Sequence, residues 1–221
     1  MNIVTAATDF EMAAFCRQYG ENEKVTTFVT GIGPVETATR LASFLATFPR
    51  KVSCVLNIGI GGAYLGRQNG AGLLDLCLAK REILGDLGIC FDDRIEPLPG
   101  EGLGGKYTFE LDQSLLRQAC DILDEHEIVY KVGNFVTVNG VSATERRGTM
   151  LGNLHQGLCE NMEGAAAARV CEEFAVPLVE LRCISNLVED RNRENWQIKP
   201  AADKCAEAAA MVLRGMLDEQ R

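Results

Sequence analysis

The sequence predicts an α/β fold with a largely parallel or mixed sheet. Apolar segments of strand length alternate with segments of helical character along its 221 residues. Hydrophobic residues make up 47% of the chain, which is enough to bury a full core. We find no internal repeat and no low-complexity tract. The length allows one large domain or two small ones, and we expect a single domain over residues 1–221.

The first half of the chain supplies three predicted strands and two helices. In order these are a strand at 2–7, a helix at 11–19, a strand at 24–30, a helix at 34–48 and a strand at 52–58. Pro34 suits the first turn of its helix because its ring fixes a helical φ. Gly31-Ile-Gly33 resembles the start of a dinucleotide fingerprint, but Glu36 replaces the third glycine, which argues against such a site. We interpret Gly59–Gly62 as a ligand loop rather than a plain tight turn, because it follows a strand.

The second half continues the alternation. Its predicted elements are strands broken by turns at 71–91, a loop at 97–105, a helix at 110–127, a strand pair or one long bent strand at 128–138, a short helix at 143–151, a helix at 164–174, a strand at 178–184 and a closing helix at 200–217. Glu163 opens the alanine-rich helix, where backbone N–H groups and the helix dipole favour an anion. Ser185 and Asn186 follow their strand at its carboxyl end, the edge at which open α/β sheets bind ligands.

Charge and composition exclude several classes of partner. The net charge of −9 argues against nucleic acid and anionic membranes. The first residues lack a basic region followed by a long apolar run, so we expect no signal peptide. No apolar run has the length that a membrane span needs. We therefore expect a cytosolic protein that acts on a small molecule.

The nine cysteines form no C-x-x-C pair. Four of them lie in apolar runs: Cys54, Cys77, Cys90 and Cys183. The odd count and this placement predict reduced core thiols. We do not expect a zinc site, because His126 and His155 lie near no clustered cysteines.

Four short motifs carry a family resemblance. They are Gly31-Ile-Gly-Pro-Val-Glu-Thr-Ala, Asn57-Ile-Gly-Ile-Gly-Gly, Asn161-Met-Glu-Gly-Ala-Ala and Leu181-Arg-Cys-Ile-Ser-Asn. Over residues 2–209 the chain resembles the purine nucleoside phosphorylase superfamily, and within it the branch of the methylthioadenosine/S-adenosylhomocysteine nucleosidases. Together with the segment Asp190–Trp196, the motifs are most similar to the futalosine hydrolases. The resemblance implies a three-layer α/β/α sandwich with a central mixed sheet, a homodimer, and neither cofactor nor metal.

The resemblance also implies an activity. It is hydrolysis of the N-glycosidic bond of futalosine to hypoxanthine and dehypoxanthinyl futalosine, a step of menaquinone biosynthesis. Such a reaction passes through an oxocarbenium-like ribosyl centre, so the site must activate water, hold the ribose hydroxyls and stabilise charge on the departing base.

Three alternatives stay open. One is cleavage of methylthioadenosine or S-adenosylhomocysteine. Another is phosphorolysis, which needs cationic phosphate ligands that the glycine turns lack before Arg67. The third is a non-catalytic purine-binding module, which would have no use for Glu11.

The resemblance assigns three residues to water and ribose. Glu11 matches the glutamate that activates water, a role that suits a carboxylate acting as general base. The alternative to this catalytic role is that Glu11 is a solvated glutamate in the first turn of a helix. Glu163 matches the glutamate that accepts hydrogen bonds from the ribose 2′- and 3′-hydroxyls, or it only complements the helix dipole. Met162 is expected to pack under the sugar or, instead, to fill the core.

Arg182 stands in an otherwise apolar strand, and a buried guanidinium needs a carboxylate partner. The resemblance implies that it positions the nucleophilic water with Glu11, while a purely structural ion pair is the alternative. Ile60 stands where the relatives carry a serine, which removes one ligand of the water. Gly61 and Gly62 fit backbone contacts to the sugar or base.

Asn186 differs from the aspartate that the adenine-cleaving relatives carry at this position. Asparagine offers a donor and an acceptor but cannot protonate a base. Its N–H₂ suits a 6-oxo group and its carbonyl accepts from N7–H, so the residue favours a hypoxanthine-type leaving group. The alternative is a plain turn residue at a strand end. We also assign Ser185 to substrate binding and Val141 to the purine face.

The charged segment after Asn186 is the candidate for the far end of the substrate. Futalosine carries a carboxyphenyl group beyond the ribose 5′ position. An arginine fork suits a carboxylate and an aromatic ring suits Trp196, which gives the hypothesis that Arg191 or Arg193 binds the carboxylate. The alternative is a solvated loop whose arginines pair with neighbouring acids while Trp196 anchors it.

Overall fold

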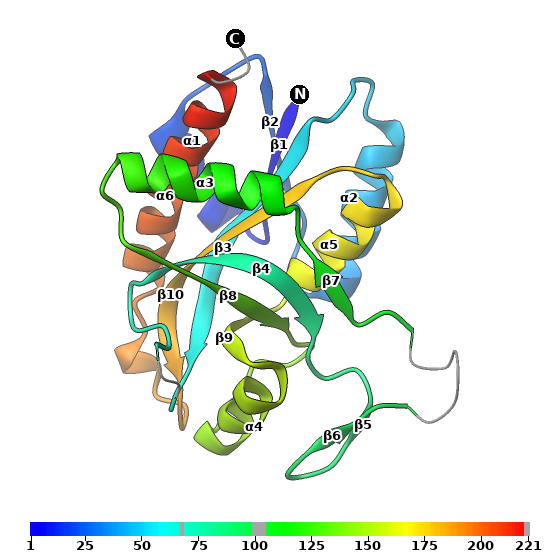
Figure 1. Ribbon diagram of the computed structural model, residues 1–221, viewed down its shortest axis with the longest axis vertical. Helices are drawn as coiled ribbons and strands as arrows, with labels where there is room; N and C mark the ends of the chain where they lie inside the picture. The colour runs from blue at the N-terminus through cyan, green and yellow to red at the C-terminus, as the bar shows by residue number, and fades with distance from the viewer. Residues whose placement is uncertain (67–68, 99–104, 219–221) are drawn as a thin grey trace.

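The computed structural model describes residues 1–66, 69–98 and 105–218, and these form three layers (Figure 1). The middle layer is a mixed eight-stranded sheet in the order β10-β4-β8-β9-β3-β1-β2, with β7 paired to β4. The strands are β1 (Asn2–Ala6), β2 (Val25–Val29), β3 (Cys54–Tyr64), β4 (Leu76–Leu84), β7 (Thr108–Glu110), β8 (Tyr130–Thr137), β9 (Gly157–Asn161) and β10 (Leu178–Val188). The predicted α/β class with a central mixed sheet is confirmed.

Strand β10 pairs with both β3 and β4. Strands β3, β10, β4, β8 and β9 therefore form a closed ring of pairings, from which β1 and β2 extend as an open parallel sheet. A separate hairpin of β5 (Ile89–Cys90) and β6 (Ile95–Glu96) projects away from the main sheet (Figure 1).

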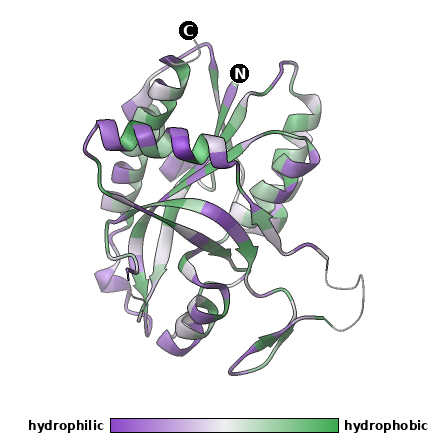
Figure 2. Ribbon diagram, viewed as in Figure 1, coloured by the Kyte–Doolittle hydropathy of each residue, from purple (hydrophilic) through white to green (hydrophobic). Residues whose placement is uncertain are grey.

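Helices cover the sheet on both faces. On one face α1 (Asp9–Tyr19) and α3 (Gln113–Glu125) pack against α6 (Ile198–Asp218), and on the other α2 (Pro34–Thr47) packs against α5 (Gly164–Glu173). Helix α4 (Glu145–His155) contacts β8 and β9 near the hairpin side. Two clusters of buried hydrophobic residues lie one on each side of the sheet. In Figure 2 hydrophobic residues run along much of the strands, and the helices carry both hydrophobic and hydrophilic residues. No helix in the described ranges is both long and apolar enough to cross a membrane.

Local sequence explains where two helices near the site begin. Thr8 and Glu11 form a reciprocal capping box, in which each side chain accepts from the backbone N–H of the other. Pro34 occupies the first turn of α2, as its fixed φ predicts. The capping box ties the Glu11 side chain to the end of β1.

Two strands run further than the sequence predicts. Strand β3 continues through Gly59–Gly62 to Tyr64, so the predicted ligand loop is wrong: these glycines are paired with β10. Strand β10 continues to Val188, so Asn186 lies inside a strand rather than at its end. A register irregularity between Ile184 and Asn186 marks the point where the pairing shifts by one residue.

Other boundaries also differ. Within the predicted range 128–138 the structure has one strand, β8 (Tyr130–Thr137), and β9 is an element that we did not predict. Cys90 is exposed on the hairpin, so its placement in the core is wrong; Cys54, Cys77 and Cys183 are buried. Most of the loop predicted at 97–105 lies outside the described residues.

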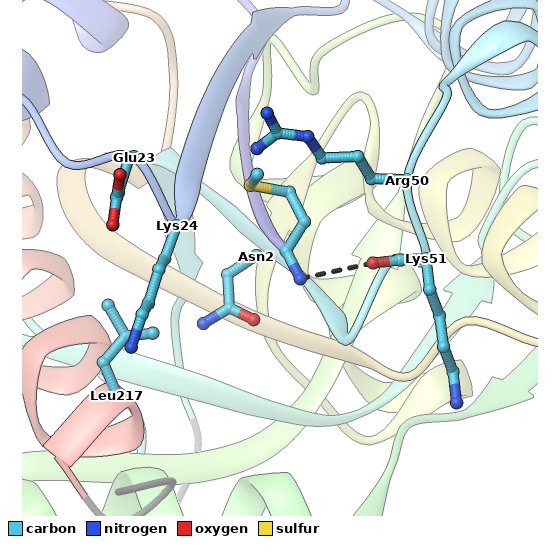
Figure 3. Close-up of a pocket in the computed structure, with 7 residues that line it drawn as sticks. Asn2, Glu23, Lys24, Arg50, Lys51 and Leu217 are labelled. Carbon is cyan, nitrogen blue, oxygen red and sulfur yellow. Dashed lines mark hydrogen bonds between the residues drawn. The ribbon is translucent and has the colours of Figure 1, made fainter.

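A hollow lies at the amino ends of β1 and β2 (Figure 3). Asn2, Lys24, Arg50 and Lys51 line it, and the Met1 ammonium donates to the Lys51 carbonyl at 3.2 Å. Parallel strands place their ligand sites at the carboxyl edge, and this hollow is at the opposite edge. None of the predicted site residues lines it.

Candidate active site

A pocket of about 380 Å³ lies at the carboxyl ends of β1, β3 and β10. Carboxylates and amides gather on its polar side, whereas Phe10, Ile32, Trp196 and Ile198 supply apolar surface. We call it the site pocket. A mostly apolar pocket with a few convergent polar groups is the usual form of a small-molecule site.

Glu11 reaches the pocket from the first turn of α1. Its Oε1 accepts from the backbone N–H of Ile60 at 3.1 Å, and its Oε2 accepts from the Thr8 hydroxyl at 2.7 Å. The side chain is 7% exposed, so this is no solvated glutamate. A carboxylate fixed by three donors at the pocket wall keeps free lone pairs that a water can approach.

Gly59 explains why the sequence carries glycine at this place in β3. A Cβ there would lie 2.7 Å from Glu11 Oε1 and 2.6 Å from Arg182 Nη1. The Glu11 carboxylate and the Arg182 guanidinium therefore both lie close to the backbone of Gly59, which has no side chain. Any larger side chain would displace the carboxylate, the guanidinium or both.

Arg182 is fully buried and joins two carboxylates. Its Nη1 donates to Glu163 Oε2 at 3.4 Å, and its Nε donates to Glu180 Oε1 at 2.9 Å. Burial alone would lower the pKa of the guanidinium, but the charges of Glu180, Glu163 and Glu11 outweigh burial and raise it. Arg182 thus has a structural ion-pair partner in Glu180, and it also lines the site pocket beside Glu163.

Glu163 precedes the first residue of α5 and points into the pocket. Its Oε1 accepts from the Gly33 backbone N–H at 3.1 Å. Burial raises the pKa of its carboxyl group, while Arg182 and the Gly33 hydrogen bond oppose that rise. The backbone is held by Asn161, whose Oδ1 accepts from the N–H groups of Glu163 and Gly164 at 2.8 and 2.7 Å.

A buried pair of carboxyl groups supports this arrangement from below. The Asn161 amide donates to Glu82 Oε1 at 2.6 Å, and the Thr137 hydroxyl donates to Glu82 Oε2 at 2.8 Å. A Cβ at Gly164 would overlap both Glu82 and Glu180, so these two carboxyl groups are neighbours. Burial, and then the charge of Glu180, raise the pKa of Glu82 well above its ordinary value.

Asn186 faces the pocket beside the β3 glycines. Its Oδ1 accepts from the Ser185 hydroxyl at 2.9 Å, and its Nδ2 donates to the Leu187 carbonyl at 3.3 Å. A Cβ at Gly62 would lie 3.1 Å from Asn186 Nδ2, so glycine leaves room for this amide. A side chain with one donor and one acceptor group is thereby fixed at the pocket wall.

Residues 5–218 match the model of the phosphorylase superfamily. The chain belongs to this superfamily. It is 34% identical to futalosine hydrolase of Thermus thermophilus over 83% of this chain and 79% of that protein. It is 26% identical to aminodeoxyfutalosine nucleosidase of Helicobacter pylori over 90% and 81% of the two chains. A solved structure of a futalosine hydrolase mutant from H. pylori superposes with a TM-score of 0.81, at 23% identity over 99% and 98% of the chains, and this likeness concerns the fold.

In this member of the phosphorylase superfamily, most of the predicted site residues line one pocket. They are Glu11, Gly61, Gly62, Val141, Met162, Glu163, Arg182, Ser185 and Asn186. Ile60, which stands where the relatives carry a serine, contributes through its backbone N–H, which donates to Glu11. The roles assigned to these residues remain predictions.

Arg191 and Arg193 do not line the site pocket as the structure describes it. The Arg191 guanidinium lies 5.0 Å from the centroid of the Trp196 ring, and Trp196 does line the pocket. The Arg191 backbone N–H also donates to the Ala143 carbonyl at 3.1 Å, next to the pocket residues Val141 and Ser142. Arg191 is therefore at the pocket rim.

Sequence reasoning missed three groups at the site. Glu160 lines the pocket from β9, and Glu82 and Glu180 lie beneath it. The signal for Glu160 was its position directly before Asn161-Met162-Glu163, at the end of a strand that we did not predict. The signal for Glu180 was a glutamate within an apolar strand, like Arg182, whereas Glu82 directly follows Lys80 and Arg81 and carried no such signal.

Proposed function

We propose that this protein hydrolyses the N-glycosidic bond of futalosine, releasing hypoxanthine and dehypoxanthinyl futalosine for menaquinone biosynthesis. The observation that carries the proposal is Asn186, a neutral amide placed in the same pocket as the carboxylates of Glu11 and Glu163. Futalosine hydrolase of Thermus thermophilus, at 34% identity, supports the same substrate.

Glu11 acts as general base. A water placed against its carboxylate attacks C1′ of the ribose while the bond from C1′ to N9 breaks and its electron pair passes to the purine. Glu11 takes the proton that the water loses, and Arg182 helps to orient that water. Holding the attacking water beside the Glu11 carboxylate in one fixed geometry removes much of the entropic part of the activation barrier.

Glu163 holds the sugar. Its carboxylate accepts hydrogen bonds from the ribose hydroxyls, and these donors favour the charged form of a group whose pKa burial raises. Met162 packs under the ring. Gly61 and Gly62 contact the sugar or base through their backbone. A Cβ at Gly61 would lie 3.0 Å from the Glu160 carbonyl oxygen, so glycine also lets β9 lie close to β3.

Asn186 reads the leaving base. The base gains a proton at N7 from water, and the Asn186 carbonyl accepts a hydrogen bond from that N7–H while the N–H₂ donates to the 6-oxo oxygen. Ser185 fixes the amide in this orientation by donating to its oxygen. Val141 contacts the purine face.

Phosphorolysis is the less favoured reaction. Arg182 is the one arginine or lysine that lines the site pocket over the described ranges, and both Glu180 and Glu163 bind it. A phosphate would compete with these carboxylates for a single guanidinium. An attacking water needs only the carboxylate of Glu11 as its general base, and no further cationic ligand.

We further propose that the chain acts as one nucleosidase domain and as a homodimer in the cytosol. Phe10, Ile32 and Val35 support the dimer, because they are 46%, 59% and 74% exposed and two of them line the pocket. Apolar surface of this kind at the mouth of a site favours an interface. The free thiols support a reducing compartment.

The decisive experiment compares futalosine, inosine and methylthioadenosine as substrates, each with and without phosphate. We expect futalosine to be cleaved fastest, with hypoxanthine and a free reducing sugar released at the same rate in both buffers. A sugar 1-phosphate product would favour the phosphorylase instead. Faster cleavage of methylthioadenosine would move the assignment to the adenine-cleaving branch.

A further inference from the structure

Glu160 is the third carboxylate of the site pocket in the described part of the chain, and neither water activation nor ribose binding uses it. It lies at the end of β9 and is 5% exposed. A buried carboxyl group at a pocket wall is costly unless it has partners or a ligand to meet.

The sheet register places Glu160 and Asn186 on strands to either side of the same residue of β3. Gly62 of β3 pairs with Glu160 on one side and with Asn186 on the other. Residues in register on neighbouring strands project to the same face, so the two side chains flank Gly62, two strand spacings or about 9.6 Å apart at Cα. A Cβ at Gly62 would lie 3.1 Å from Asn186 Nδ2 and 3.5 Å from Glu160 Cγ, which confirms that both flank one spot.

Ser142 holds the Glu160 carboxylate in place. Its backbone N–H donates to Oε1 at 2.8 Å and its hydroxyl donates to Oε2 at 2.7 Å. Burial raises the pKa of Glu160, whereas the Ser142 hydrogen bonds and the charge of Arg147 oppose that rise. A carboxylate has about four lone-pair positions, and Ser142 and Tyr64 occupy at most three of them, so the group remains an acceptor.

We propose that Glu160 reads the N1 position of the purine and so selects 6-oxopurines over 6-aminopurines. A 6-oxopurine carries a hydrogen on N1, next to the oxygen that Asn186 binds, whereas adenine presents a lone pair there. An ionised carboxylate accepts from the first and repels the second. The inference rests on the proposed function, because it names the base class which that function releases.

The alternative role of Glu160 is to anchor the loop that carries Val141 and Ser142. An anchor would support all bases equally, since its effect passes through the shape of the pocket. A contact to N1 would distinguish bases that differ only at that edge. The ratio of the affinities for hypoxanthine and for the other bases therefore distinguishes the two roles of Glu160.

The test is calorimetric titration of hypoxanthine, adenine and 1-methylhypoxanthine into the wild type, Glu160→Gln and Glu145→Gln. Glu145 is an exposed glutamate at the start of α4 and does not line the pocket, so its variant matches the charge change. We expect the wild type and Glu145→Gln to prefer hypoxanthine over both other bases. We expect Glu160→Gln to lose on the order of 10- to 100-fold of this preference, the worth of one charge-assisted hydrogen bond.

Equal weakening of all three bases in Glu160→Gln would overturn the proposal in favour of an anchor. If that variant does not fold, the wild type alone decides, because equal binding of hypoxanthine and 1-methylhypoxanthine excludes a contact to N1–H. Base binding needs no turnover. A protein that selects hypoxanthine yet fails to cleave futalosine would therefore refute the proposed function while leaving the role of Glu160 standing.

Discussion

Gly33 and Glu163 lie 130 residues apart in the chain, and the Gly33 backbone N–H donates to Glu163 Oε1 at 3.1 Å. Gly33 is also the residue before α2, with φ of 91° and ψ of 163°. This conformation favours glycine, so the hydrogen bond depends on the residue type of Gly33 as well as on its position. The turn after β2 thereby fixes the proposed ribose ligand.

Gly33→Ala is expected to strain this turn by about 1–3 kcal/mol and to lower kcat/KM by roughly 10-fold, because the N–H moves away from Glu163. Gly20→Ala is the matched control, since Gly20 also has a positive φ, has open space around its Cα and ends α1 away from the pocket. Both variants are expected to melt at lower temperature. Only the first is expected to lose activity, and equal kinetic losses would contradict the assignment.

Glu11→Gln is expected to reduce kcat by at least about 10²-fold, the usual contribution of a general base. Glutamine also serves in a capping box, so α1 keeps its start. Asp9→Asn changes an exposed acid in the same helical turn and is expected to leave turnover within a few-fold of wild type. Steady-state cleavage of futalosine measures both, and near-normal turnover of the first variant would remove Glu11 from the mechanism.

Arg191→Ala is expected to raise KM for futalosine by roughly 10-fold, because Arg191 lies against the pocket residue Trp196 and suits a carboxylate. Inosine lacks the carboxyphenyl group, so its slow cleavage is expected to be unchanged. Arg193→Ala is the comparison, because the Trp196 backbone N–H donates to the Arg193 backbone carbonyl at 3.2 Å, a contact that alanine keeps, and Arg193 does not itself line the pocket in the described ranges. Equal losses on both substrates would mean that Arg191 supports the loop or the base site.

Glu82→Gln is expected to change how stability depends on pH. The pKa of Glu82 is raised in the folded protein, so between its ordinary value near 4.5 and the raised value the folded state binds the extra proton. The free energy of unfolding contributed by this group is therefore present below that window and falls as pH rises through it, by at most about 1.4 kcal/mol per pH unit. Thermal melts from about pH 5 to about pH 9 are expected to decline less in Glu82→Gln than in the wild type.

The control for that series is Glu207→Gln, because Glu207 is exposed on α6. Its melting curve is expected to follow the wild type at every pH. Parallel pH profiles of the wild type and Glu82→Gln would show that Glu82 is ionised in the folded protein.

The sequence predicts those parts of the fold that depend on interactions between residues close together in the chain. Strand and helix alternation and Pro34 are local signals, and the elements that they predict are present. The continuation of β3 through Gly59–Gly62 was missed because glycine weakens a strand on its own. Only the charged groups of Glu11 and Arg182, brought against Gly59 by tertiary packing, show why the strand carries glycine there.

The same limit applies to the site. Motifs identified Glu163 and Asn186, and the family resemblance identified Glu11. No local pattern distinguishes a glutamate that faces a pocket from one that faces water. Glu160 is recognised only when β3 places Gly62 between it and Asn186. Cross-strand register is a long-range property, and short strands such as β9 give little periodic signal.

The buried cysteines give this protein a built-in reporter of how its core opens. Cys183 and Cys205 lie in the core on one side of the sheet, whereas Cys77, Cys159 and Cys171 lie on the other. Burial raises the pKa of Cys205 to about 12 and that of Cys183 to about 11, so these thiols are inert towards alkylating reagents until water reaches them. Alkylation under native conditions, followed by mass spectrometry, therefore distinguishes two kinds of opening. If all five thiols are labelled together, the core opens cooperatively. If one set is labelled first, a single helical layer separates from the sheet before the other.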